Sequence, residues 1–515
     1  ILCCVDHRAT LEDDQGIPLI AKYFNTKGRY EEVNPHLRRD ALAVNRSILQ
    51  PPSPQCREIH LTAIVRHGTR YPTARNVKDM QQLHSVVLNN STGKSSIRHG
   101  TRYPTARHVR EMRQLHSIVL NNSTGKSSRL REILSQWTMW YTEDMDGRLV
   151  QKGVEDLKHL AIRLSKLFPS LVSEEKLRGG LIRFMSSSKH RCVNSTLSFK
   201  EGLTEMWAIR DVEFGHEVND ALMRFFDQCT RFVQEVDGNQ SAVIEVQKFK
   251  QGPEIVRVRE KIAERLGVPS TFITHDLAEA AFLLCSYEFA VKAVNSPWCQ
   301  LFDEEDAKVM EYASDLREFW KRGYGHAINS RSSCILFHDL FRRLEKAAGE
   351  NKSRRQVGEA VTVQIGHADT LLPLLTLLGF FKAASENKLR QQVSEAVTVQ
   401  VGHADTLLPL LTLLGFFKDT APLTSTNFAS QTQRSFRTSH MLPYAANFLL
   451  VLYDCGEGGI RLQPLLNEKP LTFPGLTDQQ GSIPLYEEVR QHYRDLLNGC
   501  DAETECQGVN TSAEV

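Results

Sequence analysis

A histidine lies between two arginines in the segment RHGTRYPT, which begins at residue 66. Arg66 and Arg70 carry permanent charges, and each guanidinium can give paired hydrogen bonds to a phosphate group. The imidazole of His67 has an ordinary pKa of about 6.5, so its neutral, nucleophilic form is available near neutral pH. We therefore predict a phosphoryl-transfer site in which His67 is the nucleophile and the two arginines hold the phosphate.

Arginines alone are too weak to catalyse this chemistry. Three charge-assisted hydrogen bonds contribute roughly 5–9 kcal/mol in total, at about 1.5–3 kcal/mol each. Hydrolysis of a phosphate monoester requires the barrier to fall by more than about 20 kcal/mol. A covalent phosphohistidine divides the reaction into two steps, and a general acid must protonate the leaving oxygen.

The sequence GHAD offers that acid and occurs twice. Each copy follows the strand-like segment EAVTVQ and precedes a leucine-rich helical pattern. Ligands of α/β sheets bind where strands end, and helix N-termini there favour anions. Asp369 and Asp405 are thus the candidate proton donors. The segment SSKHRC, after another strand-like run, adds a third arginine, Arg191, and a further cation, Lys189.

Two tandem duplications complicate the choice of site residues. Residues 65–96 and 97–128 are nearly identical, as are residues 347–382 and 383–418. The second RHGTRYPT copy contains Arg98, His99 and Arg102, a possible duplicate site. We favour His67 because the buried-strand pattern of residues 58–65 supports the first copy, whereas polar NNSTGKSS precedes the second. Both GHAD copies carry their own strand, so both stay open, with a slight preference for the second.

The coarse pattern predicts an α/β domain interrupted by a mostly helical one. Strands are expected at 58–65, within GGLIRFMSSSKHR, at EAVTVQ and within ANFLLVLYDC, and a helix at 77–87. Residues 200–330 are rich in amphipathic helical patterns. The expected divisions are a possible signal remnant or disordered N-terminus at 1–20, an α/β catalytic domain at 21–195 and 335–515 that includes the duplicated segments, and a helical insertion at 196–334.

Composition limits the partners. The net charge is only +2 from 63 basic and 61 acidic residues, so a nucleic-acid partner is not expected and a polyanion needs a local basic cluster. Lys321 and Arg322 could join Lys189 in such a rim or simply be solvated. The TLLPLLTLLGFF run is read as a buried helix, so no membrane span is expected.

Eleven cysteines favour the secretory pathway, and so do the N-x-S/T sequences that begin at Asn45, Asn90, Asn122, Asn194, Asn239, Asn351 and Asn510. Candidate pairs are Cys285 with Cys299 and, across a small local loop, Cys500 with Cys506. The chain ends in TSAEV, and either residence in the endoplasmic reticulum lumen or secretion is expected.

Together, RHGTRYPT, SSKHRC, SPWCQLFDEEDAKVMEY, WKRGYGHAINSRSSC and GHADTLLPLL resemble the histidine acid phosphatases, branch 2 of the histidine phosphatase superfamily. The resemblance runs from about residue 20 to the C-terminus, excluding one copy of each duplication. It implies a Rossmann-like α/β domain with a helical insertion, the phosphoglycerate mutase-like fold, and neither a metal nor a cofactor. It implies His67 as nucleophile, Arg66, Arg70 and Arg191 as phosphate ligands, His403 or His367 as a further ligand, and Asp405 or Asp369 as proton donor.

The resemblance is strongest to the branch that removes phosphates from inositol hexakis- and pentakisphosphate and is linked to 2,3-bisphosphoglycerate. Close relatives have His-Ala-Glu where this chain has His-Ala-Asp, which alters the reach of the acid. The expected function is an inositol polyphosphate phosphatase. Two alternatives stay open: a broad-specificity histidine acid phosphatase, and a non-catalytic phosphate-binding relative disabled by the duplications.

Overall fold

A mixed sheet forms the centre of one half of the molecule. The computed structural model describes residues 16–49, 51, 53–72, 129–137, 140, 145, 147–210, 214–352, 396–476 and 483–508. The strands within these ranges are β1 (Arg57–Arg66), β2 (Ile182–Ser186), β3 (Glu217–Val218), β4 (Val397–Gly402), β5 (Asn447–Asp454), β6 (Ile460–Leu466) and β7 (Lys469–Pro470). Their order across the sheet is β3-β2-β4-β1-β5-β6-β7.

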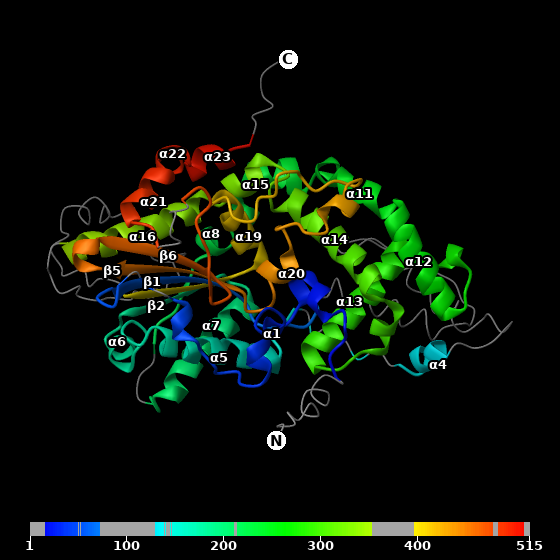
Figure 1. The fold of residues 1–515 in the computed structure, drawn as a ribbon, viewed down its shortest axis with the longest axis horizontal. Helices are drawn as coiled ribbons and strands as arrows, with labels where there is room; N and C mark the ends of the chain where they lie inside the picture. Colours follow the sequence, from blue (N-terminus) through cyan, green and yellow to red (C-terminus); the bar gives the residue numbers. More distant parts are fainter. Residues whose placement is uncertain are drawn as a thin grey trace, which may run out of the picture.

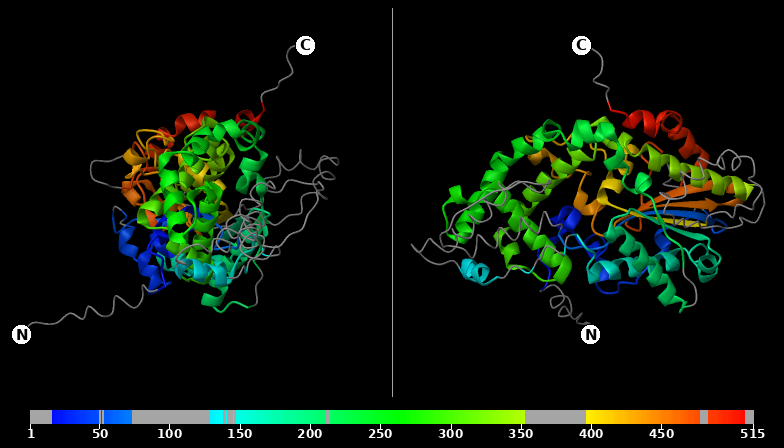
Figure 2. Two further views of the ribbon diagram at one scale, coloured as in Figure 1. Left: turned by 90° about the vertical axis from the view of Figure 1, so that its right-hand side faces the viewer. Right: turned by 180° about the vertical axis from the view of Figure 1, so that it is seen from behind.

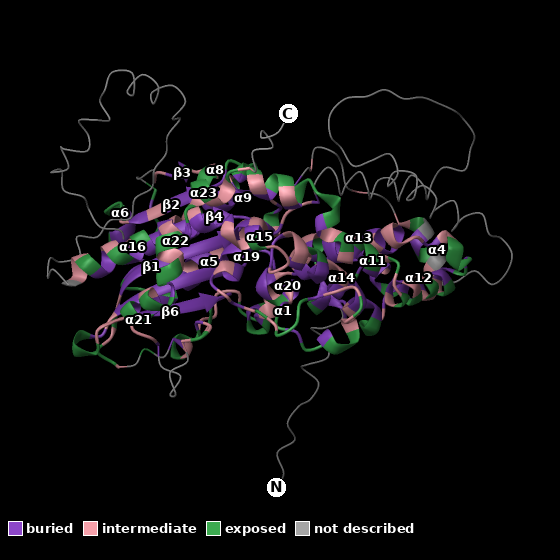
Figure 3. Cartoon of the chain, turned by 90° about the horizontal axis from the view of Figure 1, so that it is seen from above, coloured by how far each residue is buried: buried purple, intermediate pink, exposed green. Residues whose placement is uncertain are grey.

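The inner strands β1, β2 and β4 are parallel, whereas β5 runs antiparallel to β1. Each residue of β4 is buried, and β1 is buried from Ile59 onward, as expected of strands covered on both faces (Figure 3). The carboxyl ends of β1, β2 and β4 therefore meet at one edge of the sheet. The sequence predictions of strands at 58–65, before SSKHR, at the second EAVTVQ and within ANFLLVLYDC are confirmed.

Helices cover both faces of the sheet (Figure 1). Those of the sheet half are α5 (Gln151–Leu167), α6 (Glu174–Arg178), α7 (His190–Met206), α16 (Cys334–Lys352), α21 (Tyr486–His492), α22 (Arg494–Gly499) and α23 (Ala502–Cys506). Leu157, Leu160 and Leu164 of α5 pack with Leu61 and Val65 of β1 in one buried cluster. The helices α5, α6 and α7 thus form one outer layer, with α16 and α21 on the opposite side (Figure 1).

The other half of the molecule is helical, and it extends away from the sheet (Figures 1 and 2). Its elements include α8 (Asp220–Met223), α9 (Phe225–Gln228), α10 (Thr230–Phe232), the π-helix η7 (Val233–Asp237), α11 (Ile244–Lys250), α12 (Pro253–Leu266), α13 (His275–Lys292), α14 (Glu304–Lys321) and α15 (Ala327–Arg331). Further helices are α1 (Tyr30–Val33), α4 (Arg129–Gln136), α19 (Ala404–Leu413) and α20 (Thr438–Met441). The predicted fold class, an α/β sheet with many helices, is confirmed; the division at 196 and 334 stays a prediction.

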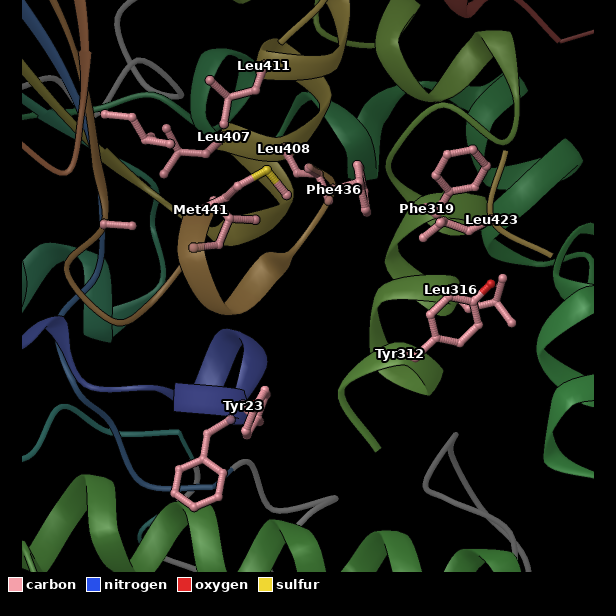
Figure 4. Close-up of a cluster of buried hydrophobic side chains, with 14 of the residues drawn as sticks. Tyr23, Tyr312, Leu316, Phe319, Leu407, Leu408, Leu411, Leu423, Phe436 and Met441 are labelled. Atoms are coloured by element: carbon pink, nitrogen blue, oxygen red, sulfur yellow. The ribbon is translucent and has the colours of Figure 1, made fainter. Parts of the chain in front are cut away.

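The two halves share one apolar core (Figure 4). Leu407, Leu408 and Leu411 of α19 lie in the same buried cluster as Leu316 and Phe319 of α14. The leucine-rich run after the second GHAD therefore forms the buried helix that the sequence predicted, and it holds the end of β4 against the helical half. No helix within the described residues is long and apolar enough to cross a membrane.

Four disulfides lie within the described ranges, and they correct one prediction. Cys285 pairs with Cys299, as expected. The pairing of Cys500 with Cys506 is wrong: Cys500 bonds Cys334 on α16, and Cys506 bonds Cys229 beside α10. The two cysteines lie at opposite ends of a helical segment that runs across the surface, so each reaches a different neighbour. The fourth bond joins Cys56 to Cys455 at the far ends of β1 and β5.

Candidate active site

Strand pairing brings the two histidine motifs together. Arg66 is the last residue of β1, and Gly402 is the last residue of β4; they are paired in the parallel register. The residues that follow, His67 and His403, are therefore neighbours, and the His67 amide donates to the Gly402 carbonyl at 3.1 Å. The two imidazole centroids lie 5.7 Å apart. Both rings are buried, at 3% and 4% exposure.

The turn after β1 is held close to α5. A Cβ on Gly68 would meet the carbonyl of Gly153 and come within 2.7 Å of Leu157 Cδ2, so only glycine fits this approach. The Gly68 amide donates to Ser195 Oγ at 3.1 Å, and the Thr69 hydroxyl donates to Asp156 Oδ2 at 2.7 Å. This packing fixes the backbone on both sides of His67.

The hydrogen bonds of His67 determine which ring nitrogen is available. Nδ1 lies 3.0 Å from the carbonyl oxygen of Gly68, which can only accept, so Nδ1 carries the proton. Nε2 then holds the lone pair of the neutral ring. Burial lowers the pKa of His67 well below 6.5, and the nearby charges of Arg191, Arg66 and Arg70 lower it further. The ring therefore remains a neutral base under acidic conditions.

His403 has the opposite arrangement. Arg191 lies 3.5 Å from Nδ1 and has only donors, so Nδ1 accepts and Nε2 donates to Ser187 Oγ at 2.9 Å. Burial, followed by the charge of Arg191, lowers the pKa of His403 to about 3, although Asp405 opposes this shift. The Cys192 thiol, the one unpaired cysteine of the described residues, packs 3.6 Å from Nε2.

Three arginines surround this pair of rings, as the sequence predicted for Arg66, Arg70 and Arg191. Arg66 stacks on Tyr444, with 4.6 Å from its guanidinium carbon to the ring centroid, and donates to the Leu442 carbonyl at 2.5 Å. Burial lowers the pKa of Arg66 to about 10, which leaves it charged at neutral pH. Arg191 enters from the first turn of α7, and His403 caps α19, so two helix N-termini add positive potential.

Asp405 lies in the first turn of α19 and faces the helical half. Arg322 Nε donates to its Oδ1 at 2.6 Å. Burial alone would raise the pKa of this carboxyl, but the charge and hydrogen bond of Arg322, helped by His403 and Lys321, lower it below its ordinary range. The structure thus places His67, His403, Asp405 and the three arginines in one site, whereas Lys189 is exposed at the start of α7.

Sequence reasoning missed several residues of the site. Lys27 on the turn η3 (Asn25–Lys27) is close enough to Arg70 and Arg66 that burial and their charges lower its pKa to about 7. Tyr444 and Ser187 were also missed. Ser187 begins the SSKHRC motif, but its hydroxyl carried no signal of a role; Lys27 and Tyr444 lie in segments without distinctive spacing, which only the tertiary fold brings to the site.

The alternative copies lie outside the described residues. These are Arg98, His99 and Arg102 of the second RHGTRYPT, and His367 and Asp369 of the first GHAD. The predicted helix at 77–87 also lies outside them. The sheet described here uses the first nucleophile copy and the second GHAD copy.

A metal-like cluster lies elsewhere. Among the described residues, His275, Asp276 and Glu279 of α13 bring ligand atoms within 4.8 Å of one another. Lys250 Nζ already lies 3.7 Å from Asp276 and 3.4 Å from Glu279. A cation of the protein therefore balances these carboxylates.

Comparison with known proteins supports the family resemblance. The model of the histidine phosphatase superfamily (branch 2) matches residues 97–400 and 390–467. The first matched range begins in the second RHGTRYPT copy, and the second range contains β4 and the second GHAD copy. The multiple inositol polyphosphate phosphatase 1 of Homo sapiens is 40% identical over 506 residues, covering 95% of this chain and 89% of the relative. That of Gallus gallus is 39% identical, covering 94% and 92%.

Solved structures share the fold at low sequence identity. The phytase from D. castellii superposes with a TM-score of 0.60 at 15% identity, covering 96% of this chain and 89% of that one. The apo form of the Bifidobacterium longum multiple inositol polyphosphate phosphatase gives 0.57 at 13% identity, covering 96% and 100%. The motif resemblance is thereby confirmed, and this chain belongs to branch 2 of the histidine phosphatase superfamily.

Proposed function

We propose that this chain hydrolyses phosphate monoesters of inositol polyphosphates, inositol hexakis- and pentakisphosphate foremost, through a phosphohistidine at His67. The observation that carries the proposal is the placement of a neutral, buried imidazole among Arg66, Arg70 and Arg191. Its relatives named above are multiple inositol polyphosphate phosphatases, and the Bifidobacterium longum protein has been solved in complex with inositol hexasulfate. The 2,3-bisphosphoglycerate reaction is a second, narrower proposal that rests on the same site.

The first step forms the covalent intermediate. Nε2 of His67 attacks the phosphorus, the bond from phosphorus to the ester oxygen breaks, and the carboxyl of Asp405 gives its proton to that oxygen. Arg66, Arg70 and Arg191 neutralise the phosphoryl oxygens, while His403 orients Arg191 through its Nδ1. The products of this step are the free alcohol, phosphohistidine and the Asp405 carboxylate.

The second step releases inorganic phosphate. A water molecule attacks the phosphorus, the bond between phosphorus and nitrogen breaks, and the Asp405 carboxylate takes the proton that the water loses. His67 returns to its neutral form with the Nδ1 proton still donated to the Gly68 carbonyl. The two proposed steps use His67, His403, Asp405 and the three arginines.

Phosphate release from phytate by the purified chain tests the proposal. Wild type is expected to release several phosphates per phytate, and His67→Ala about a thousandfold fewer per unit time. Binding of phytate without release would favour the non-catalytic alternative. A higher kcat/KM for an aryl phosphate than for phytate would favour a broad-specificity phosphatase.

We further propose that the chain works in the secretory pathway, either in the lumen of the endoplasmic reticulum or after secretion. The disulfides described above support an oxidising compartment. Fractionation of cells that express the tagged chain, followed by glycosidase treatment, would test both the compartment and the sequons.

A further inference from the structure

The proposed proton donor is held in the wrong protonation state by its own neighbour. An acid must carry a proton before it can donate one. Arg322 binds Asp405 at 2.6 Å and keeps the pKa of that carboxyl low against the effect of its partial burial. The free site therefore holds an ionised carboxylate where the reaction requires a carboxylic acid.

Arg322 is fixed in place by more than this ion pair. It is the C-cap residue that follows α14, and its guanidinium carbon lies 4.8 Å from the ring centroid of Phe232 and 5.6 Å from that of Phe226. Phe226 in turn packs edge-on against His403, 6.2 Å between centroids. A second carboxylate belongs to Asp237 on the π-helix η7, and its Oδ1 lies 3.4 Å from Nη2 of Arg322. The side chain thus spans the boundary between the helical half and the catalytic residues.

The two carboxylates that bind Arg322 are far more accessible than Arg322 itself. The side chains of Asp405 and Asp237 are 41% and 42% exposed, whereas that of Arg322 is 10% exposed. Lys321, next in the chain, also binds Asp237, at 2.8 Å. A ligand can therefore displace either carboxylate while both cations stay where they are. A phosphate dianion competes well because it carries more charge than a carboxylate and matches the guanidinium fork.

The charges around Asp405 come from three elements. Arg322 and Lys321 face it from the end of α14, His403 from the start of its own helix, and Arg66 from the end of β1. His403 is itself flanked by Arg191, Arg224 and Arg70. Among these groups, Arg322 alone donates a hydrogen bond to the carboxylate in the described structure, so its loss has the largest effect.

We propose that Arg322 couples recognition of a second phosphate group to activation of Asp405. A substrate phosphate that binds Arg322 and Lys321 displaces Asp405, whose carboxylate then takes a proton from solvent or from a monoprotonated phosphoryl group of the substrate. That proton passes to the leaving oxygen. This inference rests on the proposed function, and it predicts a preference for polyphosphates, because a monophosphate occupies the nucleophile site but leaves Arg322 on Asp405.

The test compares phytate with glycerol 2-phosphate, a monophosphate that also leaves as a secondary alcohol. The basic limb of a pH profile is the range in which kcat falls as pH rises. In wild type, we expect this fall to occur at a higher pH with phytate than with glycerol 2-phosphate. In Arg322→Met, the limb for glycerol 2-phosphate moves up by about one pH unit, because a charge that keeps Asp405 ionised is gone. The limbs of the two substrates then converge, and kcat/KM for phytate falls about tenfold or more.

Arg231→Met is the matched control. Arg231 precedes the same π-helix and binds Glu235 at 2.8 Å, but it does not contact Asp405. We expect both pH profiles of this variant to match wild type. Arg322→Lys keeps the charge and is expected to keep the wild-type limb for glycerol 2-phosphate while losing affinity for phytate.

Asp237→Asn provides a second test, which remains valid even if Arg322→Met does not fold. Removing this competing carboxylate should lower KM for phytate about threefold with kcat little changed. Two results would overturn the inference if wild type does turn over phytate. One is a basic limb that does not move in folded Arg322→Met, and the other is an unchanged KM for phytate in Asp237→Asn. Failure of wild type to turn over phytate would instead overturn the proposed function.

Discussion

Arg66 and Gly402 are register partners at the ends of the parallel strands β1 and β4. This pairing places the RHGTRYPT turn directly beside the GHAD turn and brings His67 within 5.7 Å of His403, centroid to centroid. Parallel strands have their carboxyl ends at the same edge of the sheet, so a histidine after each strand becomes part of one site. The site is therefore a consequence of strand register.

The register also assigns a role to each GHAD copy. Since β4 comes from the second copy, His403→Ala and Asp405→Asn should each lower kcat on phytate by about a hundredfold or more. His367→Ala and Asp369→Asn, the equivalent changes in the first copy, should retain most of the activity. Steady-state phosphate release by the four variants checks this, and equal losses in both copies would refute the assignment.

Gly68 and Gly153 form the contact that fixes the nucleophile turn against α5. Gly68→Ala would drive a methyl group into the Gly153 carbonyl and Leu157, so we expect a loss of roughly 1–3 kcal/mol in unfolding free energy and a lower kcat. Gly349→Ala on α16 is the control because a Cβ there meets nothing within 4 Å. That change should raise stability by about 0.5–1 kcal/mol. Thermal denaturation of both variants measures these changes. A Gly68→Ala variant as stable as wild type would contradict this account.

We expect Arg191 to set the pH below which activity is lost. Its charge, together with burial, lowers the pKa of both His67 and His403. Arg191→Gln should therefore raise both values toward 6.5. Because the nucleophile must be neutral, activity is lost as pH falls through the pKa of His67, and the acid limb should move to higher pH. The pH dependence of phosphoenzyme formation in a single turnover measures this shift.

A surface arginine provides the control for replacing an arginine by glutamine. Arg257 is 68% exposed and lies 4.0 Å from Glu254. Arg257→Gln should leave the acid limb unmoved. An unmoved limb in Arg191→Gln as well would show that this arginine does not tune the nucleophile.

The sequence was sufficient for the parts of the fold that depend on local pattern. The strand at 58–65 is mostly apolar and the helix after the second GHAD is rich in leucine, and their burial in the core explains both compositions. The arginines and histidines of the site were recognisable because their motifs lie within a few residues of a strand end.

The remainder depends on contacts between distant segments. The pairing of Cys500 with Cys334 and of Cys506 with Cys229 follows from how the C-terminal helices lie on the surface, which spacing alone does not encode. Arg322 was predicted only as a candidate for a basic rim, yet it binds the proposed acid directly. Both GHAD copies carry the same strand pattern, so the sequence could not decide between them, whereas a sheet can include only one strand at each position.

Trapping of the covalent intermediate tests the central claim most directly. The chain would be mixed with phytate labelled with ³²P, quenched in alkali after a few milliseconds because phosphohistidine is labile in acid, and digested for peptide mapping. We predict label on Nε2 of His67, with none on His99 and none in His67→Ala. An active wild-type enzyme that never carried label on His67 would contradict the mechanism.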